Sequence, residues 1–226
     1  MLWSLLSCTL KSFFGVCVLY QLFYADGSAS MGIQVILEEL AVPYRLIEST
    51  IDMNEERPEK QLLINPNGWV PVLAGSVEMY ECAAITIFLC DRHKEAGLAP
   101  TADSKERALY LQTLLYFSNS VQNAFQLDYY PERFADSSDY HVSAQKRGLR
   151  RLTETWQVID HQIANQSWVV GEKFSAADIY LFMLTTWLKP DRGQPSVRRF
   201  PNVFKIGRKV LERTSTKLVY GDFQYP

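Results

Sequence analysis

A proline-containing segment in the first half of the chain restricts its fold more than any other feature. Residues 65–73 read Asn-Pro-Asn-Gly-Trp-Val-Pro-Val-Leu, and Glu81 and Cys82 follow at the start of an apolar run. Proline cannot donate to a sheet ladder, so Pro71 belongs at a strand start or in a special turn. A Val-Pro bond also adopts the cis form at low cost, and we expect a cis bond here. That geometry turns the Val70 backbone outward, where its N–H and C=O can pair with an extended ligand.

The start of the following helix is the second constraint in this region. Ala83, Ala84, Ile85, Ile87, Phe88 and Leu89 continue from Glu81 and Cys82 as an apolar helical run. The first N–H groups of a helix have no partner within it, and they attract anions. The two features together predict a small peptide ligand with a carboxylate, held by backbone pairing at one end and by a helix terminus at the other.

Composition excludes several classes of function. The 226 residues suffice for one large domain or two small ones, with 47% hydrophobic and 21% charged residues. A net charge of -2 gives no general attraction for nucleic acid or acidic membranes. The four cysteines have neither zinc-site nor C-x-x-C spacing, and histidines number three, so we expect no metal site. So few cysteines favour a reducing compartment, and we expect a cytoplasmic protein.

The first nineteen residues form an apolar N-terminal extension. Lys11 interrupts the run, and a basic start and a small-residue cleavage site are both missing. Three interpretations compete: a membrane or targeting segment, an extra element docked on the fold, or residues outside the working fold. We favour the last interpretation and expect no membrane association.

The pattern beyond the extension predicts two domains, at residues 20–94 and 103–226, joined by a linker at 95–102 that contains Gly97 and Pro100. The first domain alternates strands and helices, which is typical of an α/β layer with a mixed sheet. Its predicted elements are a strand at 20–24, a helix capped by Ser28 or Ser30 and ended by Pro43, a strand at 44–47, a loop or short helix at 55–60, a hairpin of 70–73 with 77–80, and a helix at 81–93.

The second domain is predicted to contain helices only. Long periodic stretches occupy residues 105–125 and 140–163. A final helix is predicted to begin at 200–202, around Pro201, and to end at Glu212. Ser175 and Asp178 have the spacing of a capping box, in which the acid reaches back to the N-cap N–H, so a further helix begins there.

These motifs together resemble the cytosolic glutathione transferase family. The resemblance rests on Tyr24, the turn at 27–30, the segment at 65–71, the Glu81-Cys82 pair and Ser175-x-x-Asp178, and it covers residues 20–212. The opening strand and turn are most similar to the bacterial beta-class branch. The resemblance implies a thioredoxin-like α/β N-terminal domain with a mixed four-stranded sheet, an all-α C-terminal domain, glutathione as co-substrate and a two-fold homodimer.

The chain departs from the family pattern at two positions. Ala29 stands where the beta-class pattern has a cysteine, which excludes mixed-disulfide chemistry there. Cys82 stands where serine normally follows the acid, and a thiol is a weaker hydrogen-bond partner than a hydroxyl.

The resemblance also implies roles for individual residues. A hydroxyl near the sulfur stabilises the glutathione thiolate, and the candidates are Ser30, Ser28 and Tyr24; alternatively, a serine only caps the helix and the tyrosine packs. In the glutathione-binding set, Val70 and Pro71 pair with the cysteinyl unit, while Glu81 meets the glutamyl amino group and the Cys82 N–H meets its carboxylate.

The function that follows is conjugation of the glutathione thiolate to a small apolar electrophile. Two alternatives stay open: a non-catalytic interaction module on the same fold, or glutathione-dependent thiol or peroxide reduction through Cys82, since a helix N-terminus lowers a thiol pKa. Side chains that could line the second-substrate pocket, or simply pack, are Tyr116, Phe117, Asn119, Tyr129 and Tyr130.

Overall fold

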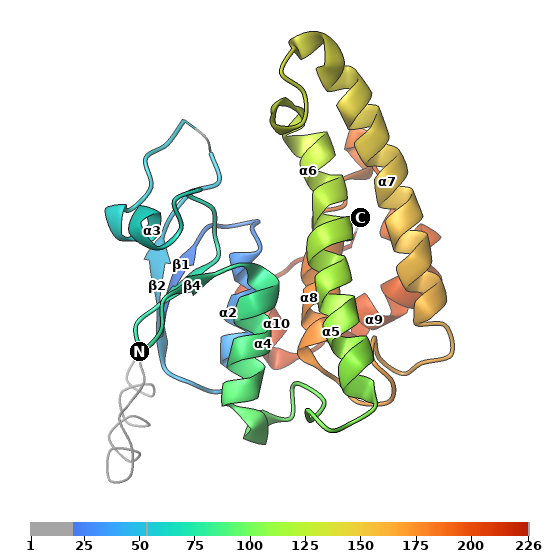
Figure 1. Ribbon diagram of the computed structural model, residues 1–226. Helices are drawn as coiled ribbons and strands as arrows, with labels where there is room; N and C mark the ends of the chain where they lie inside the picture. Colours follow the sequence, from blue (N-terminus) through green and yellow to red (C-terminus); the bar gives the residue numbers. More distant parts are fainter. Residues whose placement is uncertain (1–19, 53, 226) are drawn as a thin grey trace. The chain divides into compact units, whose positions relative to one another are not determined.

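The computed structural model describes residues 20–52 and 54–225, so the predicted N-terminal extension lies outside the described residues. The chain divides into two compact units, which we call the N-terminal unit, ending at Ala96, and the C-terminal unit, beginning at Gly97. This boundary falls within the stretch at 95–102 that the sequence suggests as a linker. Figure 1 labels the elements of both units.

A mixed four-stranded sheet forms the centre of the N-terminal unit. Its strands are β1 (Tyr20–Tyr24), β2 (Tyr44–Glu48), β3 (Val72–Ala74) and β4 (Met79–Tyr80), in the order β2-β1-β3-β4. β1 runs parallel to β2 and antiparallel to β3, and β4 is antiparallel to β3. The predicted thioredoxin-like sheet is therefore confirmed.

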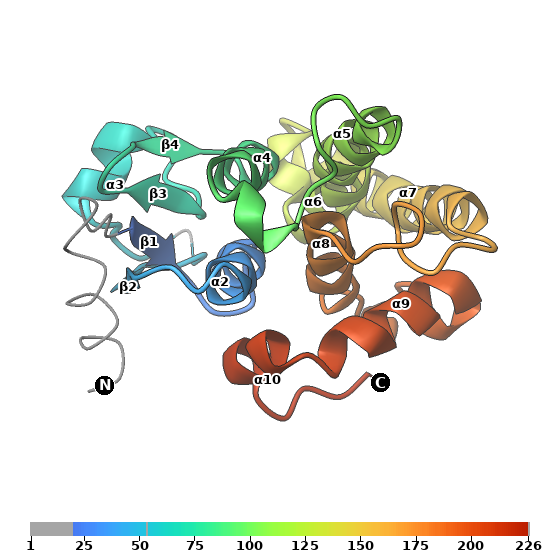
Figure 2. The same cartoon turned by 90° about the horizontal axis from the view of Figure 1, so that it is seen from below.

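Helices cover both faces of this sheet. Figure 2 shows α2 (Ser30–Glu39) and α4 (Cys82–Arg92) on one face and the short α3 (Glu59–Ile64) on the other. α2 and α4 also contact each other. Most residues of α2 are buried, among them Ile33, Val35, Ile36 and Leu37, so removal of this apolar surface from water holds helix and sheet together.

The hairpin is shorter than the sequence predicts. The expected strands at 70–73 and 77–80 each begin two residues later, at Val72 and Met79. The reason in the first strand is Pro71, which follows a cis peptide bond and cannot donate to the ladder.

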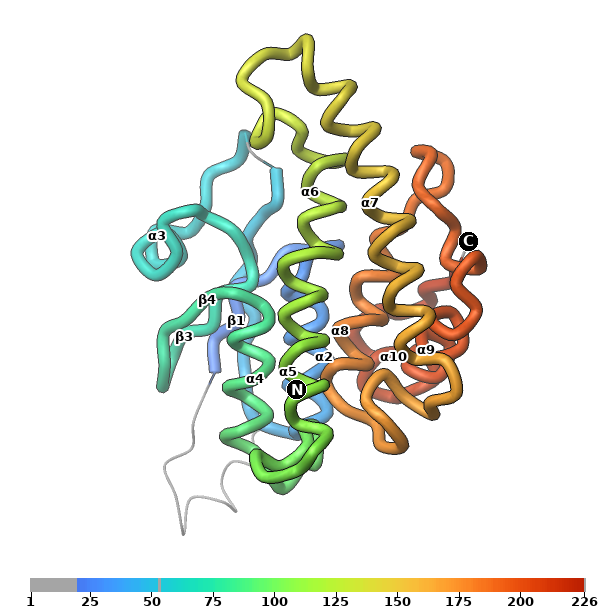
Figure 3. The backbone as a smooth tube through the Cα atoms, turned by 45° about the vertical axis from the view of Figure 1, so that its right-hand side comes forward, coloured from blue at the N-terminus to red at the C-terminus, as the bar shows by residue number. Residues whose placement is uncertain are grey.

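The C-terminal unit is helical, as predicted. One continuous helical run comprises α5 (Glu106–Tyr116), a π-helical stretch (Phe117–Gln122) and α6 (Asn123–Tyr129). The sequence analysis missed the π-helical stretch and ended this helix four residues early, at 125. The long α7 (His141–Gln162) agrees with its prediction, and Figure 3 shows it beside α6.

Gly148 allows the close approach of α6 and α7. A Cβ at this position would lie 2.9 Å from the backbone nitrogen of Asp128 and 3.1 Å from the backbone oxygen of Ala124. Any larger residue would therefore push one helix away from the other, because backbone atoms cannot rotate aside.

The centre of the C-terminal unit is α8 (Ala176–Thr185), in which all ten residues are buried. Its predicted capping box is present: the Ser175 backbone N–H donates to Asp178 at 2.7 Å. α9 (Pro201–Leu211) packs against α8, and α10 (Thr214–Tyr220), which the sequence analysis missed, follows it. Short 3₁₀ turns lie at Lys94–Ala96, Pro131–Arg133, Ser138–Tyr140, Pro190–Arg192 and Val197–Arg199.

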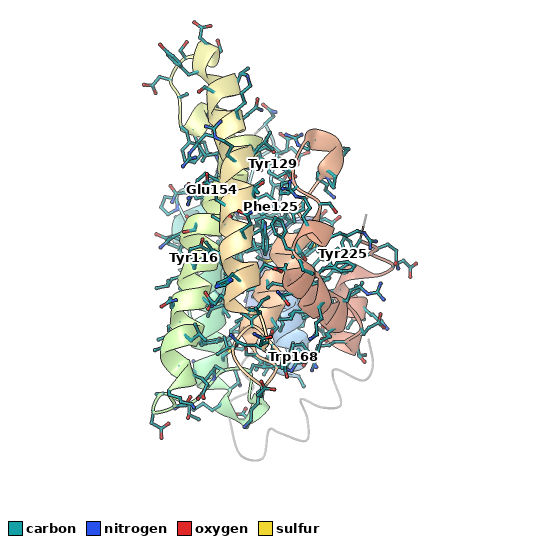
Figure 4. All side chains as sticks on the ribbon, turned by 90° about the vertical axis from the view of Figure 1, so that its right-hand side faces the viewer. Tyr116, Phe125, Tyr129, Glu154, Trp168 and Tyr225 are labelled. Carbon is teal, nitrogen blue, oxygen red and sulfur yellow. The ribbon has the colours of Figure 1, made fainter. Side chains whose placement is uncertain are left out.

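The end of the described chain folds back onto this helical core. Tyr225, labelled in Figure 4, places its hydroxyl 2.8 Å from the Thr185 Oγ1 atom and its ring edge-on against Phe182, Phe204 and Phe223. Aromatic pairs in this arrangement add to the stabilisation that comes from burial alone. Of the helices in the described ranges, none is both long enough and apolar enough to span a membrane.

Candidate functional site

The register of the sheet brings the predicted site segments to one end of the N-terminal unit. Val72, the first residue of β3, pairs with Phe23 on one side and with Tyr80 on the other. The turn after β1, the loop before β3 and the start of α4 after β4 therefore meet at the same end of the sheet. These three segments, with Tyr24 at the end of β1 and Ser30 at the start of α2, contain every residue that the sequence analysis assigned to glutathione.

The Val70–Pro71 peptide bond is cis, as predicted. Both backbone groups of Val70 precede β3, which begins at Val72, and so lie outside its ladder. Val70 is half-buried and Pro71 is buried. The arrangement suits pairing with an extended backbone.

Buried amide side chains hold this loop in position. The Gln61 side chain, fully buried on α3, donates to the Gly68 carbonyl at 2.9 Å, and the Arg57 Nε atom donates to the same oxygen at 3.2 Å. The buried Asn65 side chain donates to the Trp69 carbonyl at 3.0 Å. The sequence analysis missed Gln61 and Arg57, because only the tertiary structure brings them to Gly68.

Glu81 occupies an unusual backbone conformation at the start of α4. Its φ of 77° and ψ of 112° lie outside the regions that non-glycine residues prefer. Such conformations cluster at ligand-binding sites, where the surrounding fold maintains the strain. The Glu81 side chain is exposed, beside the first N–H groups of the helix.

Cys82 connects two of the three segments. Its side chain is only 5% exposed, and its Sγ atom lies 3.8 Å from the Ala29 carbonyl oxygen, to which it donates. The thiol thus contacts the backbone of the β1–α2 turn. The Cys82 backbone N–H lies at the start of α4.

Two serine hydroxyls form a compact network in the same turn. The Ser28 and Ser30 Oγ atoms lie 2.6 Å apart, and the Ser28 hydroxyl lies 2.7 Å from the Ala25 carbonyl oxygen. The N-cap position of α2 is Ala29, which makes no side-chain cap, so the prediction that Ser28 or Ser30 is the N-cap is wrong. Ser28 nevertheless accepts the backbone N–H of Ser30, the first helical residue, at 3.1 Å.

Tyr24 is the third candidate for the thiolate donor. Its hydroxyl donates to the Asp26 carboxylate at 3.3 Å. Burial, followed by the neighbouring Asp26 charge and hydrogen bond, raises the pKa of Tyr24. A phenol that already donates to a carboxylate is a poor donor to a second anion, which favours the serines.

The residues suggested for the second-substrate pocket lie in the C-terminal unit and differ in their surroundings. Phe117 is fully buried against Tyr180, so of the two interpretations left open by the sequence, packing applies to it. Tyr129 donates to the Trp187 carbonyl at 2.9 Å and packs on Phe125 (Figure 4). Half-buried Tyr116 and exposed Asn119 remain accessible to solvent. The Arg133 guanidinium carbon lies 4.0 Å from the centroid of the Tyr130 ring.

The described residues contain no group of three or more histidine, cysteine or acidic side chains suited to a metal ion.

The family follows from comparison with known proteins. Residues 80–213 match the family described as Glutathione S-transferase, C-terminal domain. The chain belongs to the glutathione S-transferase family. A curated transferase relative is Glutathione S-transferase GstA of Escherichia coli O157:H7, 24% identical over 172 residues, which cover 74% of this chain and 81% of the relative. Disulfide-bond oxidoreductase YfcG of Escherichia coli K12 is also 24% identical, over 86% of this chain and 91% of its own length.

Solved transferase structures share the whole fold. A sphingomonad glutathione S-transferase complexed with glutathione is 24% identical, with a TM-score of 0.76 over 88% of this chain and 96% of that one. A Sulfitobacter glutathione transferase homologue with bound glutathione is 23% identical, with a TM-score of 0.82 over 90% of this chain and 97% of that one. The beta-class enzyme of Sphingomonas chungbukensis has a TM-score of 0.75 at 23% identity.

Proposed function

We propose that this chain binds glutathione on its N-terminal unit and transfers the glutathione sulfur to a small apolar electrophile. The observation that carries the proposal is the meeting of three segments at one end of the sheet. These are the cis Val70–Pro71 loop, the strained Glu81 at the start of α4, and the serine-containing turn at 25–30. Family membership and the two similar structures that contain glutathione support the same ligand.

Each part of the tripeptide has a matching group in this arrangement. The Val70 N–H and C=O pair with the backbone of the cysteinyl unit. The Glu81 carboxylate meets the glutamyl ammonium group, and the first N–H groups of α4, beginning with Cys82, meet the glutamyl carboxylate. The cysteinyl sulfur then lies at the turn between β1 and α2.

The chemistry requires an ionised sulfur. The glutathione thiol loses its proton to solvent, and a serine hydroxyl and the N-terminal dipole of α2 stabilise the thiolate. The sulfur then forms a bond to an electrophilic carbon, and the leaving group, a chloride in an aryl chloride, departs with the bonding electron pair. A general base on the protein is unnecessary once the bound thiol is ionised.

The proposal includes a homodimer in the cytoplasm, where glutathione is kept reduced. The second substrate is a small apolar molecule with a carbon open to nucleophilic attack.

Calorimetric titration with glutathione, combined with a conjugation assay on chlorodinitrobenzene, tests the proposal. We expect binding at millimolar glutathione or tighter, and glutathione-dependent formation of the aryl thioether. Absence of binding at that concentration would contradict it, and binding without conjugation of any aryl or alkyl halide would favour a non-catalytic module. Replacing the exposed Glu81 with glutamine should weaken binding by about tenfold, the effect of losing one charge-assisted hydrogen bond.

A second candidate function is disulfide or peroxide reduction, supported by the similarity to the oxidoreductase YfcG and by the position of Cys82 at a helix N-terminus. In that reaction the Cys82 thiolate would displace one sulfur of a disulfide, and glutathione would then reduce the mixed disulfide. The same assays separate the two functions through Cys82→Ser. Conjugation survives or improves in this variant, whereas reduction through Cys82 is abolished.

A further inference from the structure

The Gln61 side chain on α3 is fully buried, and only one of its two polar atoms is used. The Nε2 atom donates to the Gly68 carbonyl at 2.9 Å, while the buried Oε1 atom has no hydrogen-bond partner among the described residues. A buried acceptor without a donor lowers stability. An apolar side chain of the same length would avoid that cost, so stability alone does not account for an amide here. The feature that distinguishes Gln61 is the hydrogen bond that it donates to the loop before β3.

Contacts on both sides fix the backbone of Gly68. Its N–H donates to the Asn65 carbonyl at 2.9 Å, and its own carbonyl accepts Gln61 Nε2 and, at 3.2 Å, the Arg57 Nε atom. Gly68 has a φ of 73°, a conformation that glycine adopts without strain. Because each peptide unit is planar, the donors at the Gly68 carbonyl set the orientation of the whole unit that joins Gly68 to Trp69.

The next peptide unit carries the Val70 N–H. Its Trp69 carbonyl accepts the Asn65 side-chain amide at 3.0 Å. This unit is trans, and in a trans unit the C=O and N–H bonds point in opposite directions, so the hydrogen bond directs the Val70 N–H away from Asn65. The Val70 side chain packs against a buried apolar cluster of β1 and β3 residues, which holds Val70 from the other side.

The orientation of the first unit affects that of the second. The two units meet at the Trp69 Cα atom, so a tilt of the Gly68 carbonyl turns the Val70 N–H as well. Gln61 opposes this tilt from a fully buried position on a helix, whose end is tied to the loop because the Asn65 N–H donates to the Gln61 carbonyl at 2.8 Å. Arg57 donates from the preceding loop, and its side chain is only partly buried. We therefore expect Gln61 to restrain the carbonyl more strongly.

We propose that Gln61 is a positioning residue for glutathione, which sets the direction of the Val70 N–H through the Gly68 carbonyl before the ligand binds. The inference rests on the proposed function, in which Val70 pairs with the cysteinyl backbone. Gln61 itself is fully buried and touches no ligand. Its effect is preorganisation: a loop that is already oriented does not have to be ordered when glutathione binds, so the affinity is higher.

Gln61→Met tests this proposal, because methionine has the length of glutamine and no hydrogen-bond donor. We expect the dissociation constant and the KM for glutathione to rise by about threefold to tenfold, the effect of losing one neutral hydrogen bond. The kcat at saturating glutathione should change by less than about twofold, because the effect is on binding and not on the chemical step.

Stability should not follow affinity in this variant. The midpoint of urea unfolding should stay unchanged or rise, because the substitution also removes the unpaired Oε1 atom and leaves Arg57 to donate to Gly68. A residue with a merely structural role would give the opposite pattern, with lower stability and an unchanged affinity of the folded protein.

Gln34→Met is the matched control. The Gln34 side chain on α2 also donates one hydrogen bond, to the Tyr44 hydroxyl at 3.3 Å, but it lies outside the three glutathione segments, so its affinity should equal that of the wild type. Gln61→Glu keeps the size of glutamine and replaces the donor with an acceptor at pH 7, so it should weaken binding at least as much as Gln61→Met. In NMR spectra of the ligand-free protein, the Val70 amide signal should shift in both Gln61 variants and stay in place in Gln34→Met.

Three results would overturn the positioning role while glutathione binding by the wild type stays intact. They are an unchanged dissociation constant in both Gln61 variants, an equal loss of affinity in Gln34→Met, and a lower kcat without a change in KM. Failure of the wild-type protein to bind glutathione is a different result, which overturns the proposed function and the positioning role together.

Discussion

Single side chains in this protein act mainly through the backbone groups that they satisfy. Asp178 shows this most clearly, since its carboxylate accepts the backbone N–H of Val169 at 2.8 Å and that of Ser175 at 2.7 Å. Asp178 is fully buried, and its two hydrogen bonds connect the loop at Val169 to the start of α8 at Ser175. Burial raises the pKa of Asp178 from 3.8 to about 6, against the opposing effects of these hydrogen bonds and of Lys209.

This raised pKa predicts a stability that falls as pH rises. The folded protein holds the Asp178 proton more tightly than the unfolded chain, so increasing the pH from about 4 to about 6 favours unfolding at this group. The full effect is at most about 3 kcal/mol, at 1.36 kcal/mol per pKa unit. Urea unfolding of the wild-type protein and Asp178→Asn measures it. The free energy of unfolding of the wild-type protein minus that of Asp178→Asn should decrease as pH rises through this window, and a constant or increasing value would contradict the prediction.

At the scale of elements, one helix is capped by a residue of another. Pro201 begins α9, and its N-cap position, Phe200, offers no side-chain acceptor. Asp160 on α7 supplies it, because its Oδ1 atom accepts the backbone N–H groups of Asn202 at 2.7 Å and of Val203 at 2.9 Å. A negative charge at this end also suits the helix dipole.

The cap predicts graded losses of stability. Asp160→Ala leaves two N–H groups of α9 without their acceptor and should reduce the free energy of unfolding by about 1–2 kcal/mol. Asp160→Asn keeps one oxygen acceptor for these two N–H groups but loses the charge and the second oxygen, which accepts the Asn202 Nδ2 at 3.2 Å, so its cost should be smaller than that of Asp160→Ala, at about 0.3–1 kcal/mol. Urea denaturation of both variants checks the order, and equal effects of the two substitutions would show that the hydrogen bonds contribute nothing.

Several elements could be predicted from sequence because their signals are local. The Ser175-x-x-Asp178 spacing alone predicted the start of α8, and the Pro201 signal predicted α9. The π-helical stretch at 117–122 and α10 have no such signal. Their conformations depend on packing, as where Phe182 of α8 meets the Tyr220 ring of α10 edge-on.

For the molecule as a whole, the proposed glutathione-binding segments lie in only one of the two units. Each has its own interior, built around the sheet in one and around α8 in the other. The three segments proposed to hold glutathione all belong to the N-terminal unit. Tyr116 and Asn119, which the sequence suggests for the second substrate, belong to the C-terminal unit.

Hydrogen exchange should therefore locate glutathione in one unit. At a concentration one hundred times its dissociation constant, a ligand stabilises the folded state by about 2.7 kcal/mol. We expect slower exchange at the turn 25–30, the loop 65–71 and the first turn of α4, with α7 and α9 unchanged as internal controls. Slower exchange confined to the C-terminal unit, in a sample that binds glutathione by calorimetry, would place the ligand elsewhere.

Residues close together in the chain were enough to predict the order of the elements, the cis bond before Pro71 and the chemistry of the loop and helix start. The candidate glutathione-binding residues also lie in short sequence motifs, which is why they could be predicted. How these residues combine in space depends on contacts between distant parts of the chain. The register of Val72 with Phe23 and Tyr80 gathers three distant segments at one end of the sheet, and the buried Gln61 side chain holds the loop before β3 through the Gly68 carbonyl. The physical reason is that strand register and burial arise from contacts between segments far apart in the chain, which no local pattern encodes.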